Sequence, residues 1–542
     1  GDVTDFARDD ADPSRDLKAA AVVLDVGGSV GSLTNRIEID AAGAISGDVD
    51  GSIYLLDLDT IGLQAGADLV VGSTADIIAR GGFLGAAGAA LEATDIVLRS
   101  QGANIGSEAT RFGITLTGGS ITAHAVNEIW LTSAVNVPVL RLEAINIVAL
   151  TSAAAISNAR GDALDTVITD RARLKGTSIG SDSDPFRIQV AQLAVETTSG
   201  PSRIHERNDL RISEAYFDGA NDVGLKLGGD LTLLVGRDLT VEKGIAAPGH
   251  TIRIDAMRDM DFDRATSDLT AQTATLFAAD TARFARDSHI AASDTLTINL
   301  DLLGPPDTAG GTLDMRGSWD AATIAVNSFN GRDTINLAPQ RIDGDITVRM
   351  GAEEDTFILT ALNDRDPADS FTVDGQGAAD EYKINRNDAP VGYVVDFADS
   401  GAANDGADIL TIDGRNTADH VLVRKGFVAL LNTDGAGGYL DDVERINYGA
   451  DMNGRIRING LGGDDRFFSD DTGTMFTLDG GAGNDTFQIG QMFGSARVSP
   501  SVAIGDEIET NETTQGFLSV GNSNPMLVYG GDGEDVFTVY SN

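Results

Sequence analysis

The stretch GGAGNDTFQ at residues 480–488 returns almost unchanged as GGDGEDVFT at 530–538, and GLGGDDRFF at 460–468 is a third close copy. Each copy is a glycine-rich turn that ends in an aspartate, and the apolar residue two positions later begins an alternation of apolar and polar residues. Glycine and aspartate favour turns, and alternation with a period of two is typical of β-strands. The stretch therefore predicts a tight turn followed by a strand.

The same turn recurs through the C-terminal half of the chain. Further copies are NGRDTINL (330–337), GAEEDTFIL (351–359) and GQGAADEYKI (375–384). The aspartates of the six turns are separated by 22, 25, 85, 20 and 50 residues, at positions Asp333, Asp355, Asp380, Asp465, Asp485 and Asp535. We interpret the short gaps as single coils of a repeating structure, the gap of 50 as two coils and the gap of 85 as about four coils.

A longer repeat runs through the N-terminal half. It reads SVGSLTNRIEI at 29–39, NIGSEATRFGI at 104–114 and SIGSDSDPFRI at 178–188, so its glycines are Gly31, Gly106 and Gly180, at spacings of 75 and 74 residues. A period of this length corresponds to about three coils of about 25 residues.

These repeats predict an all-β fold, a parallel β-solenoid (right-handed β-helix) with coils of about 20–25 residues. One coil buries too little apolar surface to fold alone, so coils must stack and share one interior. The predicted domains are 1–301, a solenoid with the 75-residue super-repeat, and 302–542, a glycine- and aspartate-rich solenoid. The seam is expected at LLGPPDTAGG, residues 302–311. Strands are expected also at 271–287, where propensity alone would allow a helix.

Composition excludes several classes of function. The chain has 83 acidic and 39 basic residues and a formal net charge of −44, which opposes nucleic-acid binding. It has no cysteine, which excludes disulfides, thiol catalysis and zinc–thiolate sites. No apolar run is long enough to span a membrane. We expect an extracellular, secreted segment of a longer chain whose targeting signals lie elsewhere.

The copies at 480–488 and 530–538 match the nonapeptide GGxGxDxUx of repeats-in-toxin proteins, and the copy at 460–468 departs from it only at Leu461. The resemblance implies Ca²⁺ as a cofactor, with ligands at Asp464, Asp465, Asn484, Asp485, Asp532 and Asp535. Family members carry such nonapeptides in tandem, whereas here each stands alone. The alternative is that these aspartates only cap backbone N–H groups of the turns.

The N-terminal half, with GGDLTLLVGRDLTVEKG at 228–244 and the three Gly-Ser phrases, resembles giant bacterial β-solenoid adhesins and filamentous-haemagglutinin-like proteins. The resemblance implies a structural and adhesive segment of a cell-surface or filament protein, not an enzyme. Its implied partners are further copies of itself, neighbouring segments of the same giant chain, or a host, matrix or carbohydrate receptor.

A β-helical polysaccharide lyase or glycosidase is the alternative function. Such enzymes need a groove with paired carboxylates and aromatic sugar platforms. The sequence offers only Trp130 and Trp319 as tryptophans, and its five histidines are scattered. Binding to ice would need threonine ladders at every coil, which the sequence does not show.

Overall fold

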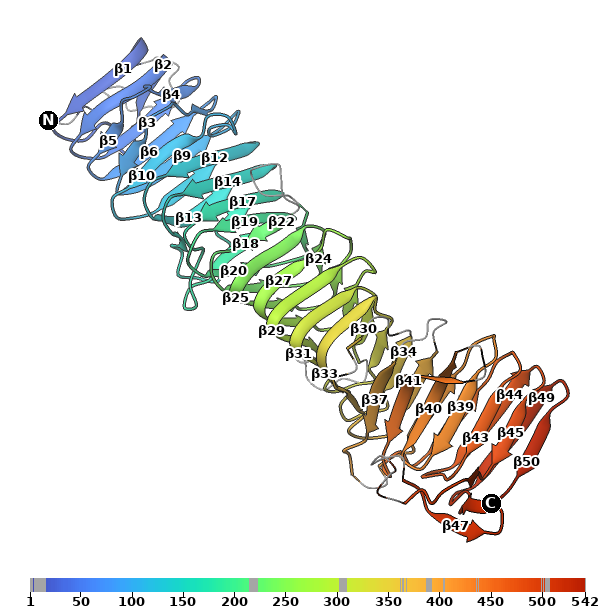
Figure 1. The fold of residues 1–542 in the computed structure, drawn as a ribbon. Helices are drawn as coiled ribbons and strands as arrows, with labels where there is room; N and C mark the ends of the chain where they lie inside the picture. Colours follow the sequence, from blue (N-terminus) through green and yellow to red (C-terminus); the bar gives the residue numbers. More distant parts are fainter. Residues whose placement is uncertain are drawn as a thin grey trace. The chain divides into compact units, whose positions relative to one another are not determined.

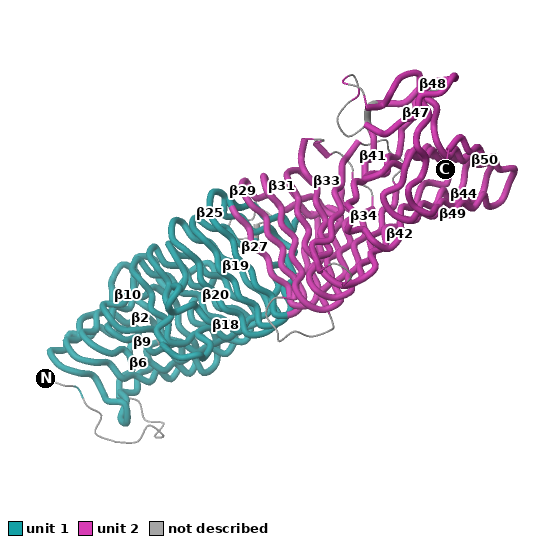
Figure 2. Tube along the Cα trace, turned by 90° about the horizontal axis from the view of Figure 1, so that it is seen from below, with its two compact units in different colours: residues 1–257, 266–272 teal, residues 258–265, 273–542 magenta. Residues whose placement is uncertain are grey.

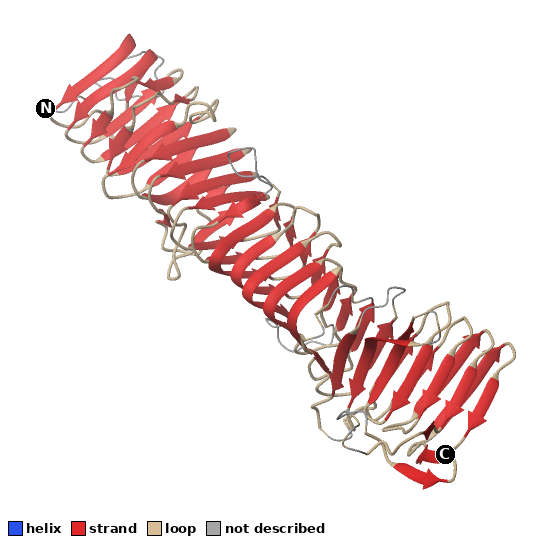
Figure 3. Ribbon diagram, viewed as in Figure 1, coloured by secondary structure: helices blue, strands red, loops and turns tan. Residues whose placement is uncertain are grey.

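The computed structural model describes residues 3, 16–213, 223–301, 310–360, 362, 365–366, 368–386, 392–402, 405–434, 436, 438–498, 500, 502 and 507–541. Its regular elements are all β-strands, and Figure 3 shows no helix in the described chain. Accordingly, no helix in this part of the chain could cross a membrane. The strands stack as parallel coils into a β-solenoid of about 20 turns, which confirms the predicted fold class.

The chain divides into two compact units (Figure 2). Unit 1 comprises residues 1–257 and 266–272, and unit 2 comprises residues 258–265 and 273–542. Most of the seam expected at 302–311 lies outside the described residues. The predicted domain boundary stays a prediction.

Unit 1 contains two long series of parallel strands (Figure 1). The first series is β3 (Ile53–Asp57), β6 (Thr74–Ala79), β9 (Asp95–Ser100), β11 (Ile121–His124), β13 (Val137–Glu143), β16 (Val167–Ile168), β18 (Phe186–Gln189), β20 (Ser202–Glu206), β23 (Leu231–Val235) and β25 (Gly244–Ala256). The second is β5 (Leu69–Val71), β8 (Leu91–Ala93), β10 (Phe112–Leu116), β12 (Glu128–Ser133), β14 (Ile147–Ser152), β17 (Arg171–Gly176), β19 (Gln192–Thr197), β22 (Val223–Lys226) and again β25. The remaining strands are β1 (Leu17–Val26), β2 (Ile37–Val49), β4 (Ile61–Leu63), β7 (Phe83–Leu84), β15 (Ile156–Asn158), β21 (Leu210–Ile212) and β24 (Leu239–Val241).

Unit 2 is built mainly from two sheets, to which successive coils each contribute. The first sheet is β26 (Met260–Phe262), β28 (Thr281–Phe284), β30 (Thr312–Met315), β32 (Thr334–Leu337), β34 (Thr356–Thr360), β36 (Glu381–Asn385), β38 (Ile409–Asp413), β42 (Arg455–Asn459), β44 (Phe476–Ala482) and β49 (Met526–Asp532). The second sheet is β29 (His289–Leu300), β31 (Ser318–Asn327), β33 (Arg341–Arg349), β35 (Phe371–Asp374), β37 (Tyr393–Ala398), β41 (Tyr439–Tyr448), β40 (Phe427–Thr433), β39 (His420–Arg424), β43 (Arg466–Ser469), β45 (Thr486–Ile489) and β50 (Val536–Val539). The division between the units falls within β27 (Leu269–Ala278). The strands expected at 271–287 are confirmed, as β27 and β28.

The interior follows from the alternation seen in the sequence. In strands such as β9 and β17, every second side chain is buried. Because neighbouring coils are in register, like residues stack: the rings of Phe467, Phe487 and Phe537 lie nearly parallel, with centroids 4.9 and 5.0 Å apart. This matches the spacing of about 4.8 Å between paired strands. A fully buried phenylalanine stabilises the fold by about 1.5–3 kcal/mol.

The three Gly-Ser phrases of unit 1 adopt the same conformation. Gly31, Gly106 and Gly180 all have positive φ, between 65° and 70°. A Cβ at any of them would lie 2.4–2.6 Å from a backbone carbonyl oxygen of the next coil, so only glycine fits. The super-repeat read from the sequence is therefore a repeat of structure.

Unit 2 interrupts the parallel pattern with an antiparallel meander in its second sheet. Strand β40 lies between β39 and β41 and runs antiparallel to both, while β41 is parallel to β37 and β39 is parallel to β43. In the first sheet β38 pairs directly with β42. The 85-residue gap between Asp380 and Asp465 therefore spans two coil steps with an insertion, and the interpretation as four coils is wrong.

The gap of 50 residues between Asp485 and Asp535 is a single coil step. Strand β44 pairs with β49 and β45 pairs with β50, so the two turns are direct neighbours. The additional residues include a small antiparallel sheet of β46 (Met492–Phe493), β47 (Thr510–Thr513) and β48 (Gly516–Ser519). The interpretation of this gap as two coils is wrong, because turn spacing alone does not distinguish an extra coil from an excursion.

Candidate functional site: two aspartate ladders

Unit 2 carries two rows of aspartates, each placed directly before a strand. The first aspartate ladder comprises Asp333, Asp355, Asp380 and Asp408, before β32, β34, β36 and β38 of the first sheet. The second comprises Asp419, Asp465, Asp485 and Asp535, before β39, β43, β45 and β50 of the second sheet. All except Asp535 are at most 2% exposed. Ionisable groups this deeply buried require partners.

In the first aspartate ladder, one carboxylate oxygen of each aspartate accepts a hydrogen bond from the backbone N–H of its counterpart in the preceding coil. The N···Oδ1 distances are 2.7 Å from Asp333 to Asp355, 2.9 Å from Asp355 to Asp380 and 3.0 Å from Asp380 to Asp408. The row ends at Asn453, whose amide oxygen accepts from the N–H of Asp408 at 3.3 Å. Each side chain thus satisfies a buried donor at the start of a strand.

The second aspartate ladder repeats this geometry on the other sheet. The N–H groups of Asp419, Asp465 and Asp485 donate to Oδ1 of Asp465, Asp485 and Asp535 at 2.6, 2.8 and 3.0 Å respectively. The structure thus brings together three of the six residues proposed as calcium ligands, Asp465, Asp485 and Asp535.

The other three candidate ligands lie nearer the surface. Asp464 Oδ1 accepts from the N–H of Asn484 at 2.8 Å, and Asn484 Oδ1 accepts from the N–H of Glu534 at 2.9 Å. Asp532 is exposed and contributes its backbone carbonyl, which accepts from Gly483 N–H at 2.9 Å. The polar side chains of this outer row therefore cap backbone donors of the adjacent coil.

A glycine five residues before the aspartate makes room for the carboxylate. A Cβ at Gly460, Gly480 or Gly530 would lie 2.0–2.1 Å from Oδ2 of the aspartate in the same turn. These glycines are required for close approach, whereas the following glycines, such as Gly481 and Gly531, have positive φ. Leu461 occupies the corresponding position with φ of 70°, a conformation that costs a leucine about 1–2 kcal/mol.

Burial raises the pKa of the ladder carboxyls, because the charged form loses its hydration. The pKa of Asp333 rises to about 6, that of Asp355 to about 8 and that of Asp380 to about 7. In the second aspartate ladder, burial raises the pKa of Asp465 to about 7 and also raises that of Asp485. Neighbouring ladder aspartates add to the effect at Asp355, Asp380, Asp465 and Asp485 by like-charge repulsion.

The second aspartate ladder offers oxygen atoms of the type that Ca²⁺ prefers as ligands. The Oδ2 atoms of Asp465 and Asp485 are buried without a hydrogen-bond partner. Oδ2 of Asp485 and the carbonyl oxygen of Gly530 lie within 2.5 Å of the point that a Cβ of Gly480 would occupy, and such hard oxygens suit Ca²⁺. The described residues contain no cluster of three or more acidic or histidine side chains that could hold a metal. Carbonyls and water would therefore have to supply most of the shell, and the calcium site stays a prediction.

Sequence reasoning did not find Asp408, Asp419 or Asn453. Asp408 and Asp419 precede apolar residues by two positions, as the other turn aspartates do, and Gly414 stands five residues before Asp419. A search for Gly-x4-Asp followed by an apolar residue would have found Asp419. The role of Asn453 depends on which coil lies beside Asp408, and local sequence does not contain that information.

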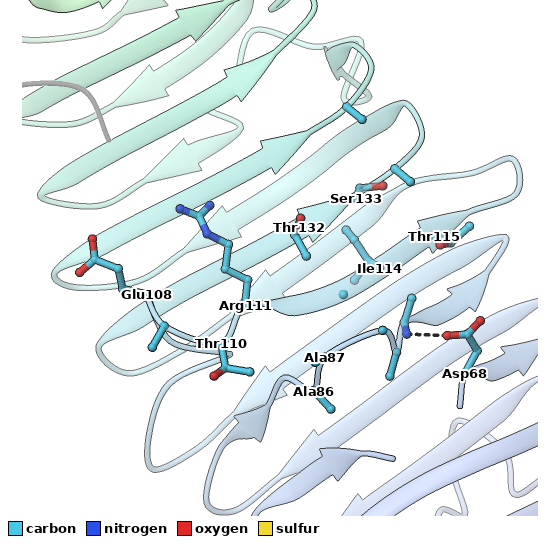
Figure 4. A pocket seen from close by; sticks show the side chains of 17 residues that line it. Asp68, Ala86, Ala87, Glu108, Thr110, Arg111, Ile114, Thr115, Thr132 and Ser133 are labelled. Atoms are coloured by element: carbon cyan, nitrogen blue, oxygen red, sulfur yellow. Dashed lines mark hydrogen bonds between the residues drawn. The ribbon is translucent and has the colours of Figure 1, made fainter. Parts of the chain in front are cut away.

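Unit 1 holds a groove with a volume of about 760 Å³ (Figure 4). Its walls consist mainly of alanines and hydroxyl residues, together with the loop that follows Gly106. The charged side chains around it are engaged: Glu108 pairs with Arg173 at 3.1 Å, and Asp68 Oδ1 accepts from the N–H of Ala90 at 2.7 Å.

Neither tryptophan is available as a sugar platform. Trp130 is 4% exposed, with the guanidinium groups of Arg111 and Arg173 over its ring at 5.5 and 5.9 Å, and Trp319 is fully buried. Comparison with known proteins adds no assignment: no family model, no curated protein and no solved structure matches the chain.

Proposed function

We propose that this chain is a structural and adhesive segment of a large secreted bacterial surface or filament protein. The observation that carries the proposal is that polar side chains bond one coil to the next. In both aspartate ladders the carboxylates accept hydrogen bonds from backbone N–H groups of the adjacent coil. A series of coils linked this way resists separation along the stack, because each coil is bonded to both neighbours. Partners would be further copies, neighbouring segments of the same chain, or a matrix or carbohydrate receptor.

Calcium is part of this proposal as a stiffening ion at the second aspartate ladder. Bound Ca²⁺ would neutralise Asp465 and Asp485, whose second oxygens have no hydrogen-bond partner. It would also relieve the repulsion of a chain with a net charge of −44.

Adhesion is tested by coating beads with the chain and measuring their retention on glycan, matrix-protein and self-coated surfaces, with and without Ca²⁺. The proposal expects retention on at least one surface, in excess of that of beads coated with an equally acidic unrelated protein. Retention equal to this control on every surface would contradict the adhesive role.

The second candidate is a β-helical polysaccharide-active enzyme, favoured by the groove of about 760 Å³ in unit 1. Incubation with a panel of acidic and neutral polysaccharides distinguishes it. New reducing ends would indicate a glycosidase, and unsaturated sugars absorbing in the ultraviolet would indicate a lyase. The structural proposal expects neither product.

A further inference from the structure

The first aspartate ladder has a row of buried oxygen atoms without hydrogen-bond partners. Oδ1 of each aspartate caps a backbone N–H, but Oδ2 of Asp333, Asp355 and Asp380 is buried with no hydrogen-bond partner. These side chains are at most 2% exposed, so water does not solvate them. At Asp355 an ionised carboxylate would have neither a second hydrogen-bond donor nor bulk solvent for its charge.

The charged groups that act on these carboxyls are themselves acidic. Asp301 acts on Asp333, Glu353 acts on Asp355, and Asp399, Asp405 and Asp408 act on Asp380. The basic residue next to Asp333 in the chain, Arg332, pairs with Glu354 at 2.7 Å, and both side chains are more than half exposed. This ladder therefore differs from other buried acids of unit 2, such as Asp470, which pairs with Arg424 at 2.8 Å.

The end of the first aspartate ladder shows that an uncharged side chain can also accept the backbone hydrogen bond. Asn453 takes the next position after Asp408 and accepts its N–H through an amide oxygen. An uncharged carboxyl presents the same carbonyl oxygen to the backbone and adds one O–H donor at Oδ2. Beside Asp380 an acceptor is close: the Tyr382 hydroxyl and Oδ2 of Asp380 both lie 2.1 Å from the point that a Cβ of Gly375 would occupy.

We propose that Asp355 and Asp380, in the middle of the first aspartate ladder, hold protons in mildly acidic solution, retain them into the neutral range and ionise as the solution becomes mildly alkaline. Each ionisation places a charge between acidic neighbours inside the stack. The coils of the first sheet are then held less tightly, and unit 2 becomes a proton-responsive segment. This response is independent of the calcium proposed for the second aspartate ladder.

The sign of the pH dependence follows from linkage. Burial raises the pKa of Asp355 to about 8 and that of Asp380 to about 7, whereas an aspartate in the unfolded chain has a pKa of 3.8. Between these values the folded unit holds protons that the unfolded chain releases. The contribution of these carboxyls to the stability of unit 2 is therefore largest in acid, falls as the pH rises from about 4, and is lost once the pH has passed about 7 to 8.

Thermal unfolding of the full chain in chelator tests this proposal, with Trp319 fluorescence as the reporter of unit 2 in a Trp130→Phe background. We expect a lower unfolding midpoint at about pH 9 than at about pH 5. Asp355→Asn should reduce this difference and raise the midpoint at the alkaline pH. The control Glu354→Gln removes an equal charge from the exposed neighbour and should leave the difference unchanged. A wild-type midpoint that is constant or rises with pH would overturn the proposal, as would an Asp355→Asn loss of equal size at both pH values.

Infrared spectroscopy gives a second readout that does not depend on any variant folding. At neutral pH the wild-type chain should show the carbonyl stretch of protonated carboxyl groups, which shifts in deuterated water and disappears as the ladder ionises. Absence of this band at neutral pH would show that the ladder is ionised and would refute the proposal.

Discussion

The turns of unit 1 are capped mostly by hydroxyls and surface carboxylates, whereas those of unit 2 are capped by buried aspartates in rows. In unit 1, Ser29 Oγ accepts from the N–H of Ser52 at 3.1 Å, and half-buried Asp95 accepts from Ser120 N–H at 2.8 Å. Glu206 is a buried carboxyl there with its pKa raised to about 7 by burial, but both its oxygens accept backbone N–H groups. Unit 1 also contains Asp57, a fully buried aspartate whose Oδ2 has no hydrogen-bond partner and whose pKa is raised by burial. The difference is that unit 2 arranges its buried aspartates in rows whose carboxylates bond one coil to the next.

The two tryptophans allow the units to be followed separately. Trp130 lies in unit 1 and Trp319 in unit 2, and both are buried, so each should change its fluorescence when its own unit unfolds. Stability in a solenoid is approximately a sum over coils and their nearest-neighbour interfaces. A change made in one unit should therefore move its own reporter more than the other.

The largest effect is expected from Arg386→Ala, which removes the cation that holds the meander. The Arg386 guanidinium donates to Glu444 at 3.0 Å and to Asn432 at 2.8 Å, and it pairs with Asp419, all in buried positions. Removing one partner of a buried ion pair costs about 3–5 kcal/mol. Denaturant unfolding monitored by Trp319 should show this loss.

The matched control is Arg316→Ala, because Arg316 pairs with Asp314 on the surface and is 59% exposed. Its loss should change the free energy of unfolding by less than about 1 kcal/mol. Equal losses for the two arginines would contradict the role assigned to Arg386.

Calcium should sharpen the contrast between the units. If the second aspartate ladder binds Ca²⁺, a concentration one hundred times the dissociation constant stabilises unit 2 by about 2.7 kcal/mol. The unfolding midpoint reported by Trp319 should rise in Ca²⁺ and fall back to its original value in chelator. Asp485→Asn should reduce this rise. A rise of equal size in the Trp130 reporter, or one reproduced by sodium chloride of equal ionic strength, would indicate only charge screening.

Gly480→Ala should destabilise unit 2 through a steric clash. Its Cβ would lie 2.1 Å from Oδ2 of Asp485 and 2.5 Å from the carbonyl oxygen of Gly530. Overpacking of this kind costs about 1–3 kcal/mol, which the Trp319 reporter can measure. Gly494→Ala is the control, since no heavy atom lies within 4 Å of its Cβ. Comparable destabilisation by both substitutions would exclude the clash as the cause.

The smallest effect is expected from Leu461→Gly, and it is a gain. Leu461 has φ of 70°, which glycine adopts without strain, so the change should stabilise unit 2 by about 1 kcal/mol. Leu164→Gly is the control, because Leu164 is an exposed leucine of unit 1 that does not have positive φ. This change should not increase stability. A loss at Leu461 would mean that its side chain contributes more through packing than its backbone costs.

Sequence could predict the solenoid because its signals are local: alternating strands, turn glycines and an aspartate before each strand. It could also predict the equivalence of Gly31, Gly106 and Gly180, because the phrase around them is repeated. It could not assign Asp380 and Asp465 to different sheets, since that depends on how many strands the intervening chain adds. The burial of Arg386 was equally inaccessible, because its partners lie 33 to 58 residues away.

The meander also has a consequence for curvature within unit 2. Where the first sheet advances by one strand, from β36 to β38, the second sheet adds β41, β40 and β39, which Figure 1 shows side by side. Two extra strands lengthen that side by about 10 Å, a distance similar to the separation of two packed sheets. The meander is thus a wedge that favours bending of the coil stack toward the first sheet. The strand direction reverses twice across the meander, so β39 has the same direction as β37 and pairs in parallel with β43. A solenoid can therefore acquire a bend while the coils beyond the meander keep their parallel pairing.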